Sequence, residues 1–216
     1  IQKLGINQDS AIVVYDYVGV YSSPRAWWMF RAMGHAQVAV LDVGLPAWKK
    51  AGFAIEDQPE KIAAQRGNFI ANPQAGLFCD SADVLETLSD PRFAVLDARS
   101  NGRFNGTEPE PRAGLRSGHI PNSINLPYTN VIADGFVLPA TKLDSVFSNL
   151  VNKEQKLIFS CGSGVTACIT ALAAELAGYS NIAVYDGSWS EWGLTSSGLP
   201  VVKNKNRTSN EWDNHS

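Results

Sequence analysis

The sequence has no long hydrophobic run and no excess of charge of one sign. Its 216 residues carry 18 Lys and Arg against 21 Asp and Glu, a formal net charge of −3 at pH 7. This balance gives no electrostatic reason to expect nucleic acid or an anionic membrane as a partner, and none of the short apolar runs resembles a membrane span. With 44% hydrophobic and 18% charged residues, the composition is ordinary for a globular protein of one large or two small domains.

Cysteine is also scarce. The three cysteines, Cys79, Cys161 and Cys168, are odd in number and widely spaced, and no pair has the C-x2-C spacing of a metal site. The sequence therefore predicts no metal and no other cofactor. It favours a reducing, cytoplasmic location, which suits a working thiol.

Cys161 is the most informative of the three. It follows the apolar run 157–160 and precedes the helical pattern 167–178, an order that predicts a strand, a tight loop and a helix. A thiol at that position sits among free backbone N–H groups at the positive end of a helix dipole. Both effects favour the nucleophilic thiolate. Gly162 and Gly164 let the loop backbone curl around the sulfur.

The order of predicted elements occurs twice along the chain. Each copy has an apolar strand, a helix, a second strand ending in aspartate, and a tryptophan six residues later. The elements are the strands 12–16 and 38–42, the helix 24–34 and Trp48 in the first copy, and the strands 157–161 and 182–186, the helix 167–178 and Trp192 in the second. The repeat predicts two tandem α/β units with parallel sheets flanked by helices.

The two copies are unequal in length. The second has further predicted elements ahead of its cysteine, namely helices at 81–88 and 141–150 and strands at 93–97 and 123–126. The first has no counterpart of these, and two strands with two helices cannot easily cover both faces of a sheet. The resulting division is the C-terminal half of a unit at 1–53, a linker at 54–77, a complete unit at 78–202 and a polar tail at 203–216.

The short first unit has two explanations. Either its front half is lost, or it is a natural, degenerate unit that rests on the second. The helix 24–33 contains two tryptophans, which need a full core to bury them. We therefore expect a lost front half.

A cysteine loop between a strand and a helix is also typical of cysteine phosphatases and arsenate reductases. Those enzymes need an arginine six positions after the cysteine to grip an oxyanion, and here that position is Ala167. The intervening residues 162–166 carry no positive side chain. The loop therefore suits a compact sulfur species held by backbone N–H groups, with the charge of the substrate met from elsewhere.

The segment 101–112 is the expected source of that charge. It is rich in glycine and proline, which predicts a loop rather than a helix. Parallel sheets place their sites beyond the carboxyl ends of the strands, so Arg103 and Arg112 would lie at the same edge as the cysteine and suit a small carboxylate. The alternative is that both arginines are solvated or pair with Glu108 and Glu110.

On these residues the chain resembles the two-domain rhodanese-fold sulfurtransferases, and among them the 3-mercaptopyruvate type. The motifs that carry the resemblance lie at 22–29 in the first unit, and at 102–112, 118–121, 161–166 and 186–192 in the second. Thiosulfate-preferring relatives carry cationic side chains in the loop after the cysteine. Gly162 and Ser163 here are similar to the mercaptopyruvate type.

The resemblance implies a persulfide mechanism. The cysteine takes sulfur from 3-mercaptopyruvate, releases pyruvate, and passes the sulfur to cyanide or to a thiol such as thioredoxin. The implied site residues are Cys161 and Ser163 for catalysis, and Arg103, Arg112, Gly162, Gly164, Val165 and Thr166 for substrate and persulfide binding. Two alternatives stay open: a thiosulfate sulfurtransferase, or a non-catalytic persulfide carrier because the first unit is incomplete.

Several further residues are interpreted as structural. Asp16 takes the place of the cysteine in the first unit, as in the family's inactive first domain. The others are His119 ahead of a strand, Cys168 packed in the core, Asp97 and Arg99 bracing the loop, and Ser188 with Glu191 as a helix capping box.

Overall fold

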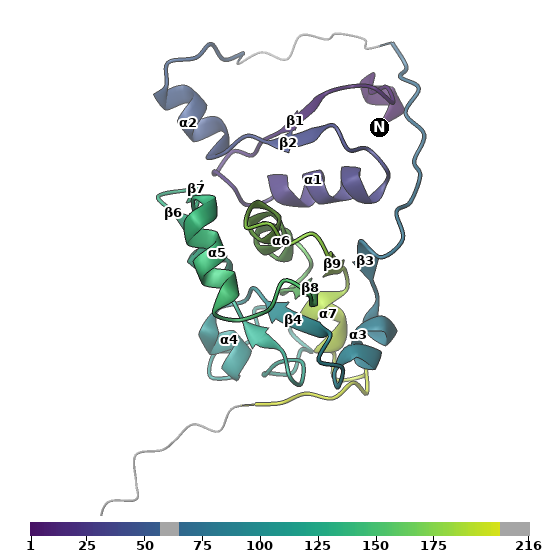
Figure 1. Cartoon of the computed structure of the whole chain (residues 1–216), viewed down its shortest axis with the longest axis vertical. Coiled ribbons are helices and arrows are strands. Elements are labelled where there is room, and N and C mark those ends of the chain that lie inside the picture. The colour runs from purple at the N-terminus through teal and green to yellow at the C-terminus, as the bar shows by residue number, and fades with distance from the viewer. Residues whose placement is uncertain (57–64, 204–216) are drawn as a thin grey trace, which may run out of the picture.

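The computed structural model describes residues 1–56 and 65–203, which form a smaller and a larger unit (Figure 1). Residues 57–64 of the predicted linker, and the predicted tail beyond residue 203, lie outside the described residues. The division of the chain into 1–53, 54–77, 78–202 and 203–216 stays a prediction. Within the described ranges, no helix is both long and apolar enough to cross a membrane.

The smaller unit is a two-stranded parallel sheet with helix α1 beneath it in Figure 1. Its elements are the 3-10 helix η1 (Gln2–Leu4), β1 (Ile12–Val14), α1 (Ser23–Ala32), β2 (Val38–Val40) and α2 (Gly44–Lys50). Ile12 of β1 lies opposite Val38 of β2 in the ladder. These are the strand, helix, strand and tryptophan helix predicted for the first copy, with shorter strands.

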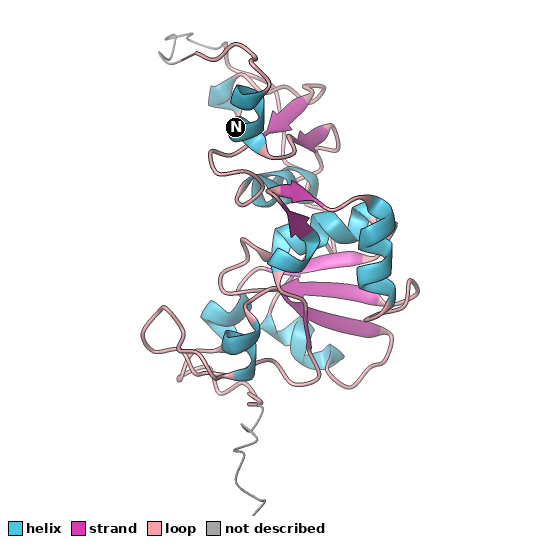
Figure 2. Cartoon of the chain, turned by 90° about the vertical axis from the view of Figure 1, so that its left-hand side faces the viewer, coloured by secondary structure: helices cyan, strands magenta, loops and turns pink. Residues whose placement is uncertain are grey.

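The larger unit contains a five-stranded sheet in the order β3-β9-β8-β4-β5, and its neighbouring strands are all parallel. The strands are β3 (Phe78–Cys79), β4 (Phe93–Asp97), β5 (Ile124–Asn125), β8 (Lys156–Ser160) and β9 (Ile182–Tyr185). The helices are α3 (Ser81–Thr87), α4 (Asn101–Asn105), η2 (Tyr128–Val131), α5 (Ala140–Ser148), α6 (Ala167–Leu176) and α7 (Ser188–Trp192), and β6 (Ile132–Ala133) and β7 (Phe136–Val137) form a small hairpin. Figure 2 shows helices on both sides of this sheet, so the predicted parallel α/β fold is confirmed.

The central strands are apolar along their length because both faces of the sheet are covered. In β8, Leu157 and Phe159 belong to the core that contains α5 and α6, whereas Ile158 belongs to the core that contains α3 and α7. All three side chains are at most 2% exposed. Burial on both faces explains why these strands are continuous apolar runs rather than alternating patterns.

The two units share one of these cores. Trp27 and Trp28 of α1 are 4% and 0% exposed and belong to the same cluster as β8 and α6. In addition, Arg31 of α1 forms an ion pair with Glu175 of α6. The expectation that the tryptophans need a full core of their own unit is therefore wrong, because the larger unit buries them.

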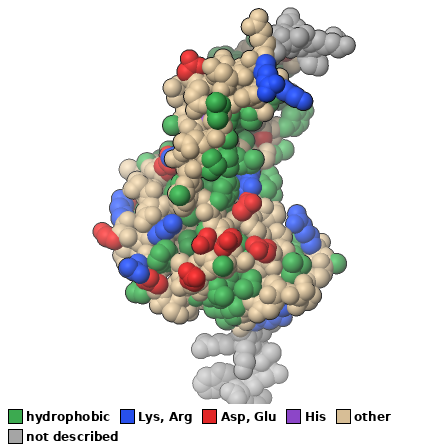
Figure 3. Space-filling model, turned by 90° about the vertical axis from the view of Figure 1, so that its right-hand side faces the viewer, with side chains coloured by type: hydrophobic (Ala, Val, Ile, Leu, Met, Phe, Trp, Pro, Cys, Tyr) green, Lys and Arg blue, Asp and Glu red, His purple; other side chains and the backbone are tan. Residues whose placement is uncertain are grey.

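The smaller unit leaves apolar side chains exposed elsewhere. Leu4, Val13 and Val18 are 69%, 62% and 73% exposed. Figure 3 shows hydrophobic side chains along the smaller unit, whereas acidic side chains gather on the larger one. The smaller unit thus has little core of its own and depends on its contact with α6 for burial.

Residues 65–77 pack along the smaller unit before they reach β3 (Figure 1). The amides of Gly67 and Phe69 donate to the carbonyls of Gln2 and Ile6 at 2.9 and 3.2 Å. A Cβ at Gly67 would lie 2.1 Å from the Ile6 oxygen, so this close approach requires glycine. Phe69 is buried with its ring 5.5 Å from that of His35.

Asp16 follows β1 as Cys161 follows β8. Its Oδ2 accepts hydrogen bonds from the amides of Tyr21, Ser22 and Ser23 at 2.8, 2.9 and 2.9 Å, and from the Ser23 hydroxyl at 2.9 Å. Burial opposes ionisation of this carboxyl, but the hydrogen bonds outweigh it and hold the pKa of Asp16 below its ordinary value. The loop after β1 is therefore a backbone cradle for an anion.

Replacing Asp16 with asparagine should destabilise the protein by about 1 kcal/mol at pH 7, after allowance for solvent screening, because the loop amides lose a charged acceptor. Because folding lowers the pKa of Asp16, the stabilisation is fully present above pH 3.8, the ordinary carboxyl pKa. It is lost as the pH falls through the pKa of Asp16 in the folded protein. Urea unfolding should thus show a lower free energy of unfolding for D16N than for wild type at pH 7, and the difference should shrink at about pH 3.

The matched control is Asp9→Asn, which changes an exposed aspartate of the same unit. It should leave the free energy of unfolding within about 0.5 kcal/mol of wild type. An equal loss in both variants, or a difference in D16N that persists in acid, would contradict the assigned role of the cradle.

Candidate active site

Cys161 lies at the carboxyl edge of the five-stranded sheet. β8 ends at Ser160 and α6 begins at Ala167, so residues 161–166 form the predicted loop between strand and helix. The residue is only 2% exposed, yet it lines a cavity of about 330 Å³. Its side chain is therefore shielded from bulk water but open to a small molecule in that cavity.

The Gly164 amide donates a hydrogen bond to Cys161 Sγ at 3.1 Å. Gly164 has φ +76°, and a Cβ there would lie 2.8 Å from the Asp186 carbonyl oxygen. Both conditions require glycine. Of the loop amides predicted to surround the sulfur, this is the one that bonds to it within the described chain.

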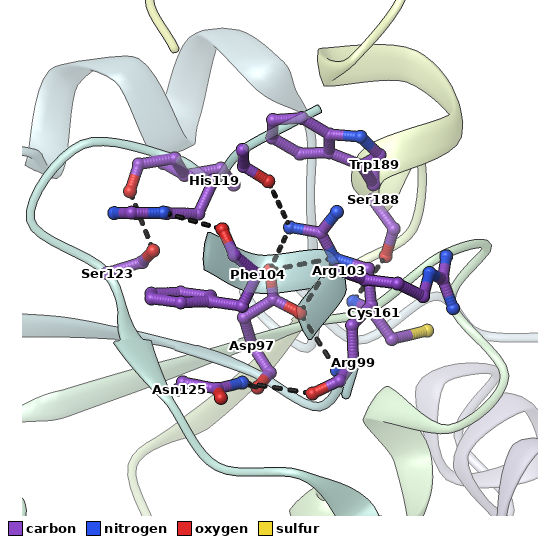
Figure 4. A network of polar contacts seen from close by, with 12 residues as sticks. Asp97, Arg99, Arg103, Phe104, His119, Ser123, Asn125, Cys161, Ser188 and Trp189 are labelled. Atoms are coloured by element: carbon purple, nitrogen blue, oxygen red, sulfur yellow. Dashed lines mark hydrogen bonds and ion pairs between the residues drawn. The ribbon is translucent and has the colours of Figure 1, made fainter. Parts of the chain in front are cut away.

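The first turn of α7 braces the backbone of Cys161 (Figure 4). The Cys161 amide donates to Ser188 Oγ at 3.1 Å, the Ser188 hydroxyl donates to the Tyr185 carbonyl at 2.8 Å, and the Trp189 amide donates to the Cys161 carbonyl at 2.9 Å. The predicted capping box of Ser188 with Glu191 is therefore wrong. The Ser188 hydroxyl serves Cys161, and the Glu191 carboxylate accepts from the Tyr185 hydroxyl at 2.8 Å.

Four parts of the chain form the walls of the cavity. They are Tyr21, then Ala98, Arg99, Ser100, Arg103, Glu110, Pro111, Arg112 and Leu115, then Tyr128, and finally Cys161, Gly162, Ser163, Val165 and Thr166. Every predicted site residue except Gly164 lines this cavity, and Gly164 contacts the sulfur directly. The role of each of these residues stays a prediction.

Two tyrosines of the cavity were not expected from the sequence. The rings of Tyr21, from the smaller unit, and Tyr128, from η2, meet edge-on with centroids 5.9 Å apart. Tyr21 immediately precedes the motif 22–29, and this adjacency is the one signal in the sequence that points to it.

A network of charged side chains supports the arginine side of the cavity, and Figure 4 shows its Asp97 and Arg99. The guanidinium of Arg99 is fully buried, 2.6 Å from Asp97 and 2.8 Å from Glu110. Glu110 also lies 2.6 Å from Arg103. Asp97 and Arg99 thus brace the segment as predicted, and the two guanidinium groups are balanced by two carboxylates.

Arg103 lies on α4, at a position where the sequence predicts a loop. The helix begins after Ser100, whose hydroxyl accepts from the Arg103 amide at 3.3 Å, and ends at Gly106 with φ +76°. The predicted loop at 101–112 is therefore wrong in its first part, because these two caps outweigh the glycine within the helix. The helix sets Arg103 against the cysteine loop, where a Cβ at Gly162 would lie 3.0 Å from Arg103 Nη2.

Arg112 is exposed at the rim of the same cavity. Within residues 1–56 and 65–203 no carboxylate pairs with it, whereas Arg103 pairs with Glu110. Glu108 instead accepts from the Ser100 hydroxyl at 2.9 Å. Because the Asp97, Arg99, Arg103 and Glu110 network is neutral, Arg112 supplies the unbalanced positive charge of the cavity wall.

The other two cysteines have different surroundings. Burial raises the pKa of Cys168 and the pKa of Cys79 to about 12. Cys168 is fully buried on α6, and its thiol donates to the Gly164 carbonyl at 3.3 Å. Both residues are neutral thiols at physiological pH, which agrees with the packing role predicted for Cys168.

His119 has a structural position, as predicted. Its Nδ1 lies 2.8 Å from the Phe104 carbonyl, and its ring stacks on the Phe104 ring at 3.9 Å (Figure 4). In the described part of the chain, no three His, Cys, Asp or Glu residues are grouped to hold a metal ion.

Known proteins match the chain over most of its length. The family model described as rhodanese-like domain matches residues 1–51 and 80–195. Thiosulfate sulfurtransferase from Rattus norvegicus is 44% identical over 195 residues, which are 88% of this chain and 65% of that protein. 3-Mercaptopyruvate sulfurtransferase from Escherichia coli strain K12 is 38% identical over 201 residues, which are 93% of this chain and 70% of that protein.

A solved structure agrees with these matches. The crystal structure of the Tum1 protein from Saccharomyces cerevisiae superposes with a TM-score of 0.82 at 32% identity, over 95% of this chain and 73% of that one. The chain spans less than two thirds of the rat protein, and relatives named for either sulfur donor match at comparable identity.

Replacing Glu110 with glutamine should lower the free energy of unfolding by about 3 kcal/mol, because it leaves the buried Arg99 with one carboxylate. Urea unfolding at pH 7 measures the loss. Glu108→Gln is the matched control, since Glu108 is exposed on the same segment and should change stability by no more than about 0.5 kcal/mol. Equal losses in the two variants would contradict the bracing role of Glu110.

Proposed function

This chain belongs to the rhodanese-like family of sulfurtransferases, and on that premise we propose that it transfers sulfur from 3-mercaptopyruvate to a thiol or cyanide through a persulfide on Cys161. One observation carries the proposal. The Cys161 sulfur accepts a hydrogen bond from the Gly164 amide at 3.1 Å and lines the same cavity as the guanidinium of Arg112, which has no carboxylate partner among residues 1–56 and 65–203. A nucleophile and a free cation thus share one small cavity.

The reaction proceeds in two half-reactions. The Cys161 thiolate attacks the sulfur of 3-mercaptopyruvate, so an S–S bond forms as the C–S bond breaks. The electron pair of the broken bond leaves as the enolate of pyruvate, which takes a proton and becomes pyruvate. Ser163 lines the cavity, and in this proposal its hydroxyl relays that proton. An acceptor thiolate, such as that of thioredoxin, then attacks the outer sulfur and restores the Cys161 thiolate.

The charge of the cavity supports the keto acid as donor. The network of Asp97, Arg99, Arg103 and Glu110 is neutral, which leaves the single charge of Arg112. The carboxylate of 3-mercaptopyruvate carries one negative charge and lies two carbons from the sulfur, so it can reach a cation at the rim. Thiosulfate carries two negative charges close to the sulfur, where residues 162–166 are uncharged.

Thiosulfate is the second candidate donor, because the rat thiosulfate sulfurtransferase is 44% identical to this chain. Initial rates with each donor and a common thiol acceptor decide between them. A higher kcat/KM for mercaptopyruvate supports the proposal, and a higher value for thiosulfate overturns the choice of donor.

Replacing Cys161 with serine should abolish both pyruvate release and the uptake of sulfur. Intact mass after incubation with 3-mercaptopyruvate should show wild type heavier by one sulfur atom and C161S unchanged. Cys79→Ser, which changes a thiol outside the cavity, should behave as wild type. Sulfur uptake by C161S would contradict the mechanism. Sulfur uptake by wild type with no transfer to any acceptor would favour a persulfide carrier.

Replacing Arg112 with alanine should raise KM for 3-mercaptopyruvate about tenfold and change kcat by less than about twofold, because an ion pair with the carboxylate is the same before and during the chemical step. Steady-state kinetics measure both constants. Arg92→Ala is the control, since Arg92 is exposed next to the opposite end of β4 and pairs with Asp90. An unchanged KM in R112A would remove Arg112 from the binding site.

A further inference from the structure

We propose that Arg25, on helix α1 of the smaller unit, is a positioning residue that holds Gly164 in the orientation that aims its amide at the Cys161 sulfur. The inference rests on the proposed role of Cys161 and adds a part for the smaller unit. Arg25 acts through the backbone of Gly164 and does not touch the substrate.

Arg25 reaches across from α1 to the back of the cysteine loop. Its Nη2 lies 2.6 Å from Asp186 Oδ1, and its Nη1 donates to the Gly164 carbonyl at 3.4 Å. The guanidinium carbon lies 5.2 Å from the centroid of the Phe78 ring. Contacts from three segments thus fix the guanidinium, and its side chain is only 23% exposed. The titratable groups beside it are Asp186 and Cys168.

Gly164 is held at both ends of its backbone. Its amide donates to Cys161 Sγ at 3.1 Å, and its carbonyl accepts from Arg25 and from the Cys168 thiol, the latter at 3.3 Å. A Cβ at this glycine would lie 3.3 Å from Arg25 Nη1, so Arg25 also packs directly against the residue. Glycine at φ +76° has no side chain to restrict it, and its orientation therefore depends on these contacts.

The position of Arg25 separates it from the residues that bind substrate. It is absent from the walls of the cavity, which Arg103 and Arg112 line. Removal of Arg25 should therefore weaken the hydrogen bond from the Gly164 amide that stabilises the sulfur anion, and it should leave binding of the sulfur donor unchanged. A fall in kcat with a constant KM is the expected signature.

Arg31 gives a matched control for a merely adhesive role. It lies on the same helix, pairs with Glu175 of α6, and packs over the Trp27 ring with its guanidinium carbon 4.8 Å from the centroid. It joins the same two units with the same kind of ion pair, but within the described part of the chain it has no hydrogen bond or ion pair to the cysteine loop.

The experiment compares Arg25→Met and Arg31→Met with wild type in the full chain. The first readout is the rate of Cys161 alkylation by iodoacetamide as a function of pH, with C161S as the blank. Cys79 and Cys168 contribute little near neutral pH because burial raises the pKa of each to about 12. The second readout is kcat and KM with 3-mercaptopyruvate.

We expect R25M to move the alkylation profile to higher pH and to lower kcat about tenfold, with KM within about twofold of wild type. R31M should match wild type in its alkylation profile, its kcat and its KM. An R25M profile that matches wild type, or an equal effect in R31M, overturns the inference. If R25M fails to fold, Arg25→Lys and Asp186→Asn test the same contact, and a smaller shift in the same direction is required. Alkylation needs no donor, so it tests Arg25 even if 3-mercaptopyruvate proves to be the wrong substrate.

Discussion

The hydrogen bond from the Gly164 amide to the Cys161 sulfur is the contact on which the site depends. It exists because the chain turns from β8 into α6 through a glycine at φ +76°, a conformation that places the amide on the sulfur and the carbonyl toward Arg25. The same turn packs so closely on the Asp186 carbonyl that no side chain fits. Ser188 and Trp189 then fix the backbone of Cys161 from the start of α7. The sheet, the two turns and the helix of the other unit therefore converge on one sulfur atom.

The two units use the same cradle for different groups. The Leu45 amide donates to the Asp16 carbonyl at 3.0 Å, as the Trp189 amide donates to the Cys161 carbonyl at 2.9 Å, so the two loops are braced alike. In the smaller unit a carboxylate oxygen of Asp16 occupies the cradle and accepts hydrogen bonds from three backbone amides. That oxygen stands two bonds from Cβ, as the outer sulfur of a persulfide on Cys161 would. Asp16 thus illustrates how a loop of this kind holds an anion at that distance, which supports the proposed persulfide.

The sequence predicts the frame of the fold well and the polar details less well. Strand 93–97 is confirmed at both ends, because burial on two faces leaves an unbroken apolar run. The loop at Cys161 is also where it was expected. By contrast, α4 depends on the caps Ser100 and Gly106, which a count of glycines and prolines does not weigh. The contacts of Glu110 with Arg103, of Ser188 with Cys161 and of Arg25 with Gly164 join residues 7, 27 and 139 positions apart, and no local pattern encodes such contacts.

The site is composite, and this explains why the smaller unit matters although it has little core of its own. The larger unit supplies the cysteine, the loop and both arginines that line the cavity. The smaller unit supplies Tyr21 to the cavity wall and Arg25 to the back of the loop. Both residues flank the start of α1, which the burial of Trp27 and Trp28 presses against α6. The packing of Trp27 and Trp28 at one end of this interface therefore sets the geometry of the polar contacts at the other, and the loss of that packing acts on Cys161 without touching it.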